Sequence, residues 1–294
     1  MAELDTVLAL IQEAERQNRM ISDIVLETQA RQSGQPAEAL LARMGENLAV
    51  MKQSAVDGRR DERSASGLSG GMARKYEQSP NSGRLLSGLA KEAIAAALAI
   101  SEHNACMGRV VAAPTAGSCG ILPAALIASQ REYGFADEAL IRALFNAAGV
   151  GMVIAKRASI SGAQGGCQAE CGSASAIAAS SLTELFGGTP NQCGQACALA
   201  LKFSMGLTCD PVAGLVEVPC VKRNASGAVS ALTAAELALA GIESAIPVDE
   251  VIDAMKQVGD LMSVSLKETS LAGLAATPTG RAIQEQMNQS TKSK

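Results

Sequence analysis

Three cysteines stand in short contexts marked by glycine or proline, and they are the residues of this chain best suited to chemistry. Cys167 follows two glycines, Cys209 lies two residues before a proline, and Cys220 directly follows one. Because glycine and proline break regular structure, these thiols are expected on loops, where they can converge as the ligands of an iron–sulfur cluster must. A lone cysteine is more often a small buried apolar residue. The three together favour the ligand interpretation.

The other cysteines call for a different interpretation. Cys193 and Cys197 are four residues apart among glycine and alanine, which favours packing on one face of a helix. Cys171 follows Cys167 at the same spacing and stays open as a reserve ligand. Neither pair shows the repeated short gaps of a structural zinc site.

Composition excludes several classes of protein. The chain has 294 residues, 48% hydrophobic but only 2% aromatic, with a net charge of −4. An acidic chain without a basic patch does not favour a nucleic-acid or anionic membrane partner. Its N-terminus lacks the basic and apolar regions of a secretory signal, and we found no uninterrupted apolar stretch long enough to span a membrane. A cytoplasmic location and reduced or metal-binding cysteines are therefore expected.

Helical periodicity dominates the chain, and we predict an all-α fold in one domain over residues 1–294, with a frayed polar tail at 284–294. The best candidate for a strand is the short run from Leu215 to Val218. The predicted helices span 6–16, 23–32, 36–56, 83–106, 122–133, 137–155, 168–185, 190–205, 225–239 and 248–262.

Four glycine-rich segments lie between these helices, at 66–71, 113–120, 161–166 and 208–224. Glycine lets the backbone approach a ligand closely, and free N–H groups before a helix bind anions. These segments predict a composite active site. The candidate residues for holding a substrate carboxylate or amine are Ser69, Gly70, Gly71, Thr115, Gly117 and Ser118.

Further candidates come from single residues. His103 is the only histidine, which rules out a zinc site built on several histidines within this chain, and it is the candidate proton acceptor. A structural role is the alternative for a lone helical histidine. The run Lys222-Arg223-Asn224 follows Cys220 closely and offers Lys222 and Asn224 as substrate-binding groups, with a solvated helix start as the alternative.

At this point a resemblance to a known family becomes specific. Its motifs are SGLSGG at 66–71, APTAGSCG at 113–120, GAQGGCQAECGSA at 162–174 and GLTCDPVAGLVEVPC at 206–220. In this order they resemble the bacterial iron–sulfur-dependent L-serine dehydratases, over roughly residues 20–280. The likeness is to the α chain of the two-subunit form.

The resemblance implies an all-helical catalytic domain with a [4Fe–4S] cluster on Cys167, Cys209 and Cys220. It also implies a separate, smaller β subunit that completes or regulates the active site. In some single-chain relatives a terminal cysteine occupies the fourth iron at rest. Here no cysteine follows Cys220, which puts that form of self-blocking in doubt.

A cluster with three protein ligands leaves one iron open, and an open metal position acts as a Lewis acid. The hypothesis is that L-serine binds there, loses its β-hydroxyl and an α-proton, and yields pyruvate and ammonia without pyridoxal phosphate. The base is His103 or a group from the β chain. Two alternatives remain, an iron–sulfur L-cysteine desulfidase and a non-catalytic scaffold subunit that binds zinc.

Overall fold

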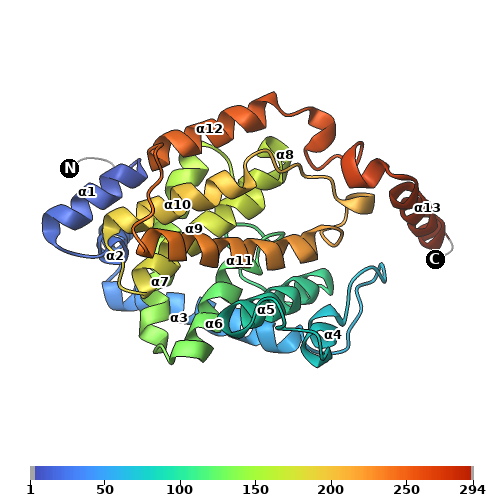
Figure 1. Cartoon of the computed structure of the whole chain (residues 1–294), viewed down its shortest axis with the longest axis horizontal. Helices are drawn as coiled ribbons and strands as arrows, with labels where there is room; N and C mark the ends of the chain where they lie inside the picture. The colour runs from blue at the N-terminus through green and yellow to red at the C-terminus, as the bar shows by residue number, and fades with distance from the viewer. Residues whose placement is uncertain (1–3, 293–294) are drawn as a thin grey trace.

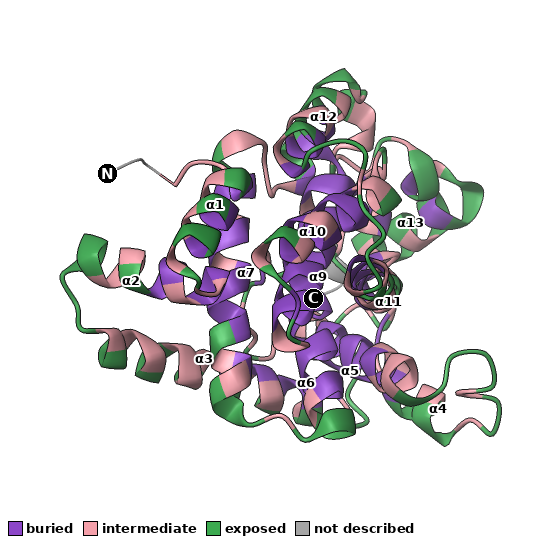
Figure 2. Ribbon diagram, turned by 60° about the vertical axis from the view of Figure 1, so that its left-hand side comes forward, coloured by how far each residue is buried: buried purple, intermediate pink, exposed green. Residues whose placement is uncertain are grey.

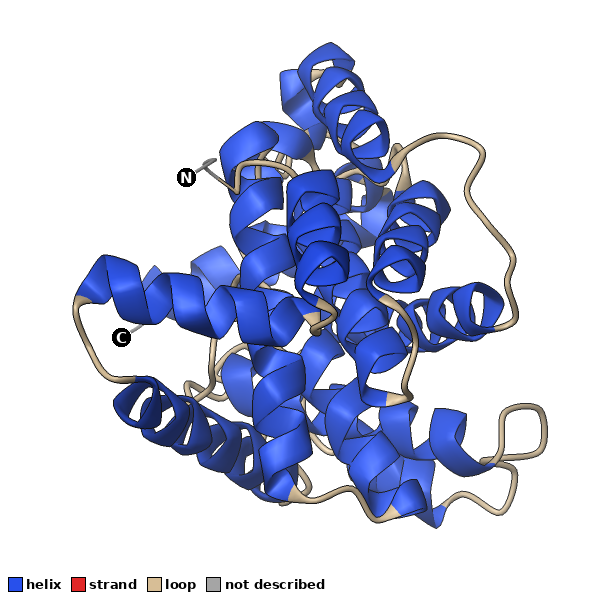
Figure 3. Ribbon diagram, turned by 90° about the vertical axis from the view of Figure 1, so that its left-hand side faces the viewer, coloured by secondary structure: helices blue, strands red, loops and turns tan. Residues whose placement is uncertain are grey.

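The structure is a computed structural model that describes residues 4–292, and it confirms the all-α class (Figures 1 and 3). Regular structure among these residues is helical, with one isolated parallel bridge between Cys209 and Lys267. The α-helices are α1 (Val7–Gln17), α2 (Ile21–Ser33), α3 (Ala37–Asp57), α4 (Met72–Gln78), α5 (Gly88–Ala105), α6 (Ile121–Tyr133), α7 (Asp137–Arg157), α8 (Gly162–Gly165), α9 (Ser173–Leu185), α10 (Pro190–Ser204), α11 (Cys220–Leu239), α12 (Val248–Leu261) and α13 (Pro278–Lys292). A π-helical turn, η1 (Gln168–Gly172), leads into α9, and short 3₁₀ turns form η2 (Val212–Gly214), η3 (Val264–Leu266) and η4 (Gly273–Ala276).

Helix α9 is the centre of the molecule. It packs against α6, α7, α10 and α11, and every residue from Ser173 to Glu184 is buried (Figure 2). Its sequence is mostly alanine and serine, so neighbouring helices can approach closely. Buried hydroxyls bind within the fold: Ser181 donates to the carbonyl of Ile177 and Ser180 to the side chain of Asn146.

The longer helices follow the predicted periodicity, with shifted ends. The helix predicted at 83–106 begins at Gly88, and the one predicted at 225–239 begins five residues earlier, at Cys220. The run from Leu215 to Val218, the best candidate for a strand, does not form one. A 3₁₀ turn precedes this run and a cis peptide bond at Val218-Pro219 follows it, so the chain makes a compact loop before α11.

Three α-helices lie outside the predicted helices, namely α4, α8 and α13. Helix α4 is short and follows the glycine-rich 64–71 loop, and α13 lies at the opposite end of the molecule from α1 (Figure 1). The frayed tail expected at 284–294 overlaps α13, which runs to Lys292, and residues 293–294 lie outside the described part. Fraying there stays a prediction.

Helix α7 is long and apolar enough to cross a membrane by length and composition. More than half of that stretch is buried inside the molecule, against α2, α3, α9 and α12. Such burial is the pattern of a core helix, and α7 contributes Leu140, Val150 and Ile154 to the main hydrophobic core.

Candidate active site

The three predicted ligand cysteines lie in three different local structures. Cys167 immediately precedes the π-helical turn η1, Cys209 lies in the loop after α10, and Cys220 is the first residue of α11. Their exposed fractions are 2%, 4% and 8%. The thiols are therefore nearly excluded from water.

Electrostatic effects link the three thiols. Burial raises the pKa of Cys209, and the Cys167 thiol and then the Glu268 and Glu170 carboxylates raise it further. Burial also raises the pKa of Cys220 to about 12, with Cys167 and Glu170 as the next causes. Cys167 thus raises the pKa of both other thiols, and Cys220 raises that of Cys209.

Cys167 differs from the other two because its thiol has favourable partners. A hydrogen bond with Cys171 is the main cause that lowers the pKa of Cys167, and the positive charge of Arg223 adds to it. The same contact and burial raise the pKa of Cys171 well above its usual range. We call Cys167, Cys209 and Cys220 the cysteine group. Cys171 is a direct neighbour of one of its members, Cys167, and it stays a reserve ligand.

The loop that carries Cys209 is fixed by a segment from the C-terminal part of the chain. The Cys209 N–H donates to the Leu266 carbonyl at 2.9 Å, and the Glu268 N–H donates to the Cys209 carbonyl at 2.7 Å. Gly162 also lies against this loop, because a Cβ there would stand 2.9 Å from the Cys209 sulfur. A side chain at position 162 would therefore press on the thiol.

The 113–120 loop reaches the same region through hydroxyl groups. The Thr115 hydroxyl donates to the Glu170 carboxylate and lies 2.9 Å from the Ser118 hydroxyl. Gly117 packs against the same carboxylate, because a Cβ there would be 2.4 Å from Glu170 Oε1. Burial raises the pKa of Glu170, the Thr115 hydrogen bond lowers it, and the charge of Glu268 raises it again.

Asn224 fastens this loop to α11. Its Oδ1 accepts from the Gly120 N–H at 2.9 Å, and its Nδ2 donates to the carbonyls of Gly117 and Cys220 at 2.7 and 3.0 Å. Asn224 is fully buried. Both of its N–H groups are thus engaged by the protein backbone.

The 64–71 loop is held by two buried carboxylates. Ser64 and Ser66 donate to Glu217, each at 2.7 Å. Glu102 on α5 accepts from the N–H groups of Gly70, Met72 and Ala73 at 2.8 to 2.9 Å. These amides, at the start of α4, therefore bind a protein carboxylate.

The predicted residues of the 64–71 loop lie beside these anchors. Ser69 is 2% exposed, and its hydroxyl has no hydrogen-bond partner among the described residues. Gly71 has a φ of +76°, a left-handed conformation that favours glycine at the turn into α4. Among Ser69, Gly70 and Gly71, Ser69 therefore has a polar side chain that could still form a hydrogen bond with a ligand.

The remaining predicted residues occupy different surroundings. His103 lies in the last turn of α5 beside Gly108, where a Cβ would be 2.2 Å from its ring, and its buried Nδ1 has no partner in the described part of the chain. Lys222 is exposed. Its neighbour Arg223 instead points inward, donating to the Thr208 carbonyl at 2.8 Å and the Asp210 carboxylate at 2.9 Å.

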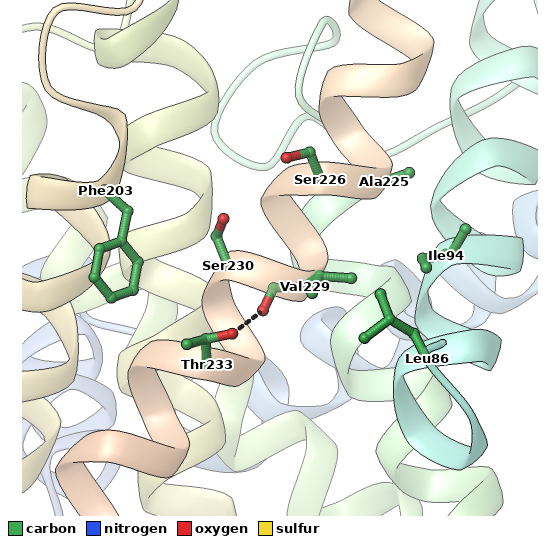
Figure 4. A pocket seen from close by; sticks show the side chains of 8 residues that line it. All are labelled: Leu86, Ile94, Phe203, Ala225, Ser226, Val229, Ser230 and Thr233. Carbon is green, nitrogen blue, oxygen red and sulfur yellow. Dashed lines mark hydrogen bonds between the residues drawn. The ribbon is translucent and has the colours of Figure 1, made fainter. Parts of the chain in front are cut away.

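Two cavities run along α11 and share Phe203, Ser226 and Ser230. The first, about 470 Å³, lies between α5, α10 and α11; Figure 4 shows its lining of apolar and hydroxyl side chains, without a titratable group. The second, about 450 Å³, is lined also by Cys171 and Arg223 and so borders the cysteine group.

Sequence reasoning did not single out Glu170, Glu268, Glu102 or Glu217 as site residues, and it considered Arg223 only as part of the cationic run 222–224. Glu170 and Arg223 stand inside segments that it did examine, whereas Glu102 adjoins the highlighted His103. Glu268 lies in a segment without periodicity, so no pattern in the sequence signalled it. No three His, Cys, Asp or Glu side chains within residues 4–292 are grouped so as to hold a single metal ion.

Comparison with known proteins agrees with these motifs. Residues 16–275 match the family model of the serine dehydratase alpha chain. The chain is 48% identical over 282 residues to the probable L-serine dehydratase alpha chain of Bacillus subtilis, covering 96% of this chain and 94% of the relative. It is 44% identical over 284 residues to the L-serine dehydratase alpha chain of Peptoniphilus asaccharolyticus, covering 95% and 97%.

A longer relative matches in part. The L-serine dehydratase of Streptomyces coelicolor is 48% identical over 181 residues, which are 61% of this chain and 40% of the relative. The near-complete matches to alpha chains and to the family model together settle the assignment. The chain belongs to the serine dehydratase alpha chain family.

Proposed function

We propose that this chain is the catalytic α subunit of an L-serine dehydratase, which converts L-serine to pyruvate and ammonia, and that residues 1–294 form one catalytic domain. The observation that carries the proposal is the convergence of the glycine-rich segments on three buried thiols. Asn224 and Thr115 tie the 113–120 loop to α11 and η1, and Leu266 and Glu268 fix the loop with Cys209. The named function of the alpha-chain relatives supports the same reaction.

We further propose that Cys167, Cys209 and Cys220 hold a [4Fe–4S] cluster. The donor set fits in its chemistry, because three buried thiols on separate segments of the chain can each bind a different iron atom. When bound, the cluster would supply a Lewis acid at the iron without a protein ligand. Pyridoxal phosphate has no part in this proposal.

The chain's own residues then bind and orient the substrate. The hydroxyls of Ser69, Thr115 and Ser118 serve as polar contacts to the substrate, with Gly70, Gly71 and Gly117 beside them in the same two loops. Asn224 keeps the 113–120 loop in place, and Lys222 offers a positive charge at the exposed start of α11. His103 remains the candidate proton acceptor, with a β-chain residue as the alternative.

The α-proton and the β-hydroxyl leave L-serine as water, giving 2-aminoacrylate. This product tautomerises to the imine and is hydrolysed to pyruvate and ammonia in solution. The protein is needed only for the elimination.

The names of the alpha-chain relatives imply a separate beta chain. We propose that this chain likewise works with a smaller β subunit, in the cytoplasm, and has no nucleic-acid or membrane partner. The complex of the two chains is therefore the proper material for assays.

The test is anaerobic reconstitution of the two-chain complex with iron and sulfide, followed by measurement of pyruvate from L-serine. The wild type should acquire the brown colour of a cluster and form pyruvate, and Cys209→Ala should lose both. A Cys209→Ala variant with full cluster and full activity would overturn the ligand assignment.

The same preparation separates the two rival functions. A preference for L-cysteine with release of sulfide would identify a desulfidase. A colourless protein that contains zinc and remains inactive would identify a scaffold subunit.

A further inference from the structure

Glu170 is a carboxylate inside the candidate active site that has no cationic partner. It extends from η1, three residues after Cys167, and accepts a hydrogen bond from Thr115. Within residues 4–292 it forms no salt bridge. The guanidinium in this region, Arg223, is already paired with Asp210 at 2.9 Å.

The negative charge of Glu170 affects the pKa of all three candidate ligands, Cys167, Cys209 and Cys220. It raises the pKa of Cys209 and of Cys220, and it opposes the lowering of the pKa of Cys167. A second carboxylate, Glu268, acts on both Glu170 and Cys209. Its Oε2 lies 3.4 Å from the Cβ position of Gly162, next to the Cys209 sulfur.

The two carboxylates differ in exposure. Glu170 is half-buried behind Thr115 and Gly117, whereas Glu268 is exposed to solvent. Glu268 thus stands at the outer side of the cysteine group and Glu170 deeper inside. Partial burial of a carboxylate without a counterion is unfavourable, and thiolate ligands would add more negative charge.

L-Serine carries a positive group that can pair with Glu170, its α-ammonium. An ammonium beside Glu170 would supply the counterion. Thr115 would keep its hydrogen bond to the carboxylate, because the two oxygens have enough lone pairs to accept from both groups. We propose that Glu170 binds the α-ammonium group of the substrate and that Glu268 attracts the same cation from solvent. This inference rests on the proposed function and names the contact that selects an amino acid over a hydroxy acid.

The experiment compares two ligands that differ in one group and cannot undergo the elimination. L-Alanine has the α-ammonium, L-lactate has a hydroxyl in its place, and neither has a β-hydroxyl. Their dissociation constants are measured by calorimetry on the reconstituted complex, and their inhibition constants are measured against L-serine. The wild type should bind L-alanine more tightly than L-lactate.

Glu170→Gln should weaken L-alanine binding about 10- to 100-fold, the loss expected for a charged hydrogen bond, and leave L-lactate binding unchanged. In the same variant the KM for L-serine should also rise, and kcat should fall by a much smaller factor than the factor by which KM rises. Glu46→Gln, an exposed residue of α3, is the matched control and should bind both ligands as the wild type does. Iron content and visible absorption show whether each variant keeps its cluster.

If Glu170→Gln does not hold the cluster, Glu268→Gln decides the matter, because an exposed side chain can be changed without disturbing the fold. It should raise the KM for L-serine several-fold at low salt and have less effect at high salt. Unchanged discrimination between L-alanine and L-lactate in Glu170→Gln, or a wild-type KM in Glu268→Gln at low salt, overturns the inference. A fall in kcat with unchanged L-alanine binding also overturns it, since Glu170 would then act on the proton rather than on the ammonium.

Failure of the proposed function gives a different result. A wild-type complex that forms no pyruvate from L-serine would refute the dehydratase proposal, whatever the binding constants show. A wild-type complex that forms pyruvate but binds L-alanine and L-lactate equally would refute only the role of Glu170.

Discussion

Asn224 on α11 and Gly120 at the start of α6 are joined by a hydrogen bond of 2.9 Å that is completely buried. The same amide binds the carbonyls of Gly117 and Cys220. One side chain therefore connects the 113–120 loop with the turn that carries a candidate ligand. Removing it leaves three backbone groups in the interior without that partner.

Asn224→Ala should lower the free energy of unfolding by about 1–3 kcal/mol and abolish pyruvate formation, because buried polar groups are left unpaired. Chemical denaturation of the variant measures the first effect. Asn104→Ala is the control, since its exposed bond at 3.2 Å to Ala116 holds the same loop. Equal losses in the two variants would contradict the role given to Asn224.

Cys220→Ser should lose most of the iron and the visible absorption after reconstitution, because serine lacks the thiolate that binds iron. Cys197→Ala tests whether any buried cysteine has this effect. Cys197 is fully buried in α10 among core side chains, so its loss should lower stability while leaving iron content unchanged. Equal loss of iron in both variants would count against the ligand set.

Gly117→Ala should weaken substrate binding with little effect on folding. The new methyl group would stand 2.4 Å from Glu170 Oε1, the far end of a flexible side chain that can move away from Thr115. Gly117 is outside the left-handed region, so alanine fits its backbone. The expected result is a KM for L-serine raised about tenfold or more, which is about 1.4 kcal/mol.

The control for Gly117→Ala is Gly45→Ala in α3, where a Cβ makes an ordinary contact at 3.5 Å with Ile141. That change should stabilise the protein by about 0.5–1 kcal/mol, because alanine favours the helix interior. An unchanged KM in Gly117→Ala would show that the carboxylate position does not matter.

Glu184 predicts a dependence of stability on pH. Burial is the main cause that raises the pKa of Glu184, which accepts from the Ser22 N–H at 3.3 Å and from Asn146 at 2.7 Å. Because the folded pKa lies above the unfolded one, the stabilisation by this group is complete below about pH 4 and is lost as the pH rises through the folded pKa.

Glu184→Gln keeps both acceptor contacts and removes the charge. Relative to the wild type, its free energy of unfolding should increase as the pH is raised from 4 to 8, as measured by urea denaturation at each pH. Glu46→Gln, an exposed change on α3, should follow the wild type throughout. A constant difference between Glu184→Gln and the wild type would refute the assignment.

The fold class followed from the sequence because the long helices have one apolar face, which local periodicity reports. Helix α4 was missed because it is only seven residues long. Its start depends on Glu102, which is distant along the chain, and no local pattern reports that contact.

The three cysteines could be proposed as ligands from the sequence because glycine and proline stand beside them, whereas the residues that surround them in the fold could not be predicted. Lys222 and Arg223 are adjacent in sequence, and only the true start of α11 at Cys220 determines which of them turns inward. Glu268 reaches Cys209 through backbone pairing between distant segments. The carboxylates of the site were thus beyond sequence reasoning, while its thiols were not.

The order in which the site closes follows from the pairing at Cys209. Cys167 and Cys220 belong to helical turns, which form through local contacts, but the loop with Cys209 is fixed by Leu266 and Glu268 from far along the chain. Contacts between distant segments form late in folding. We therefore expect the loop with Cys209 to be the last of the three cysteine segments to be fixed, which would let the proposed cluster enter on that side without unfolding of the helical body.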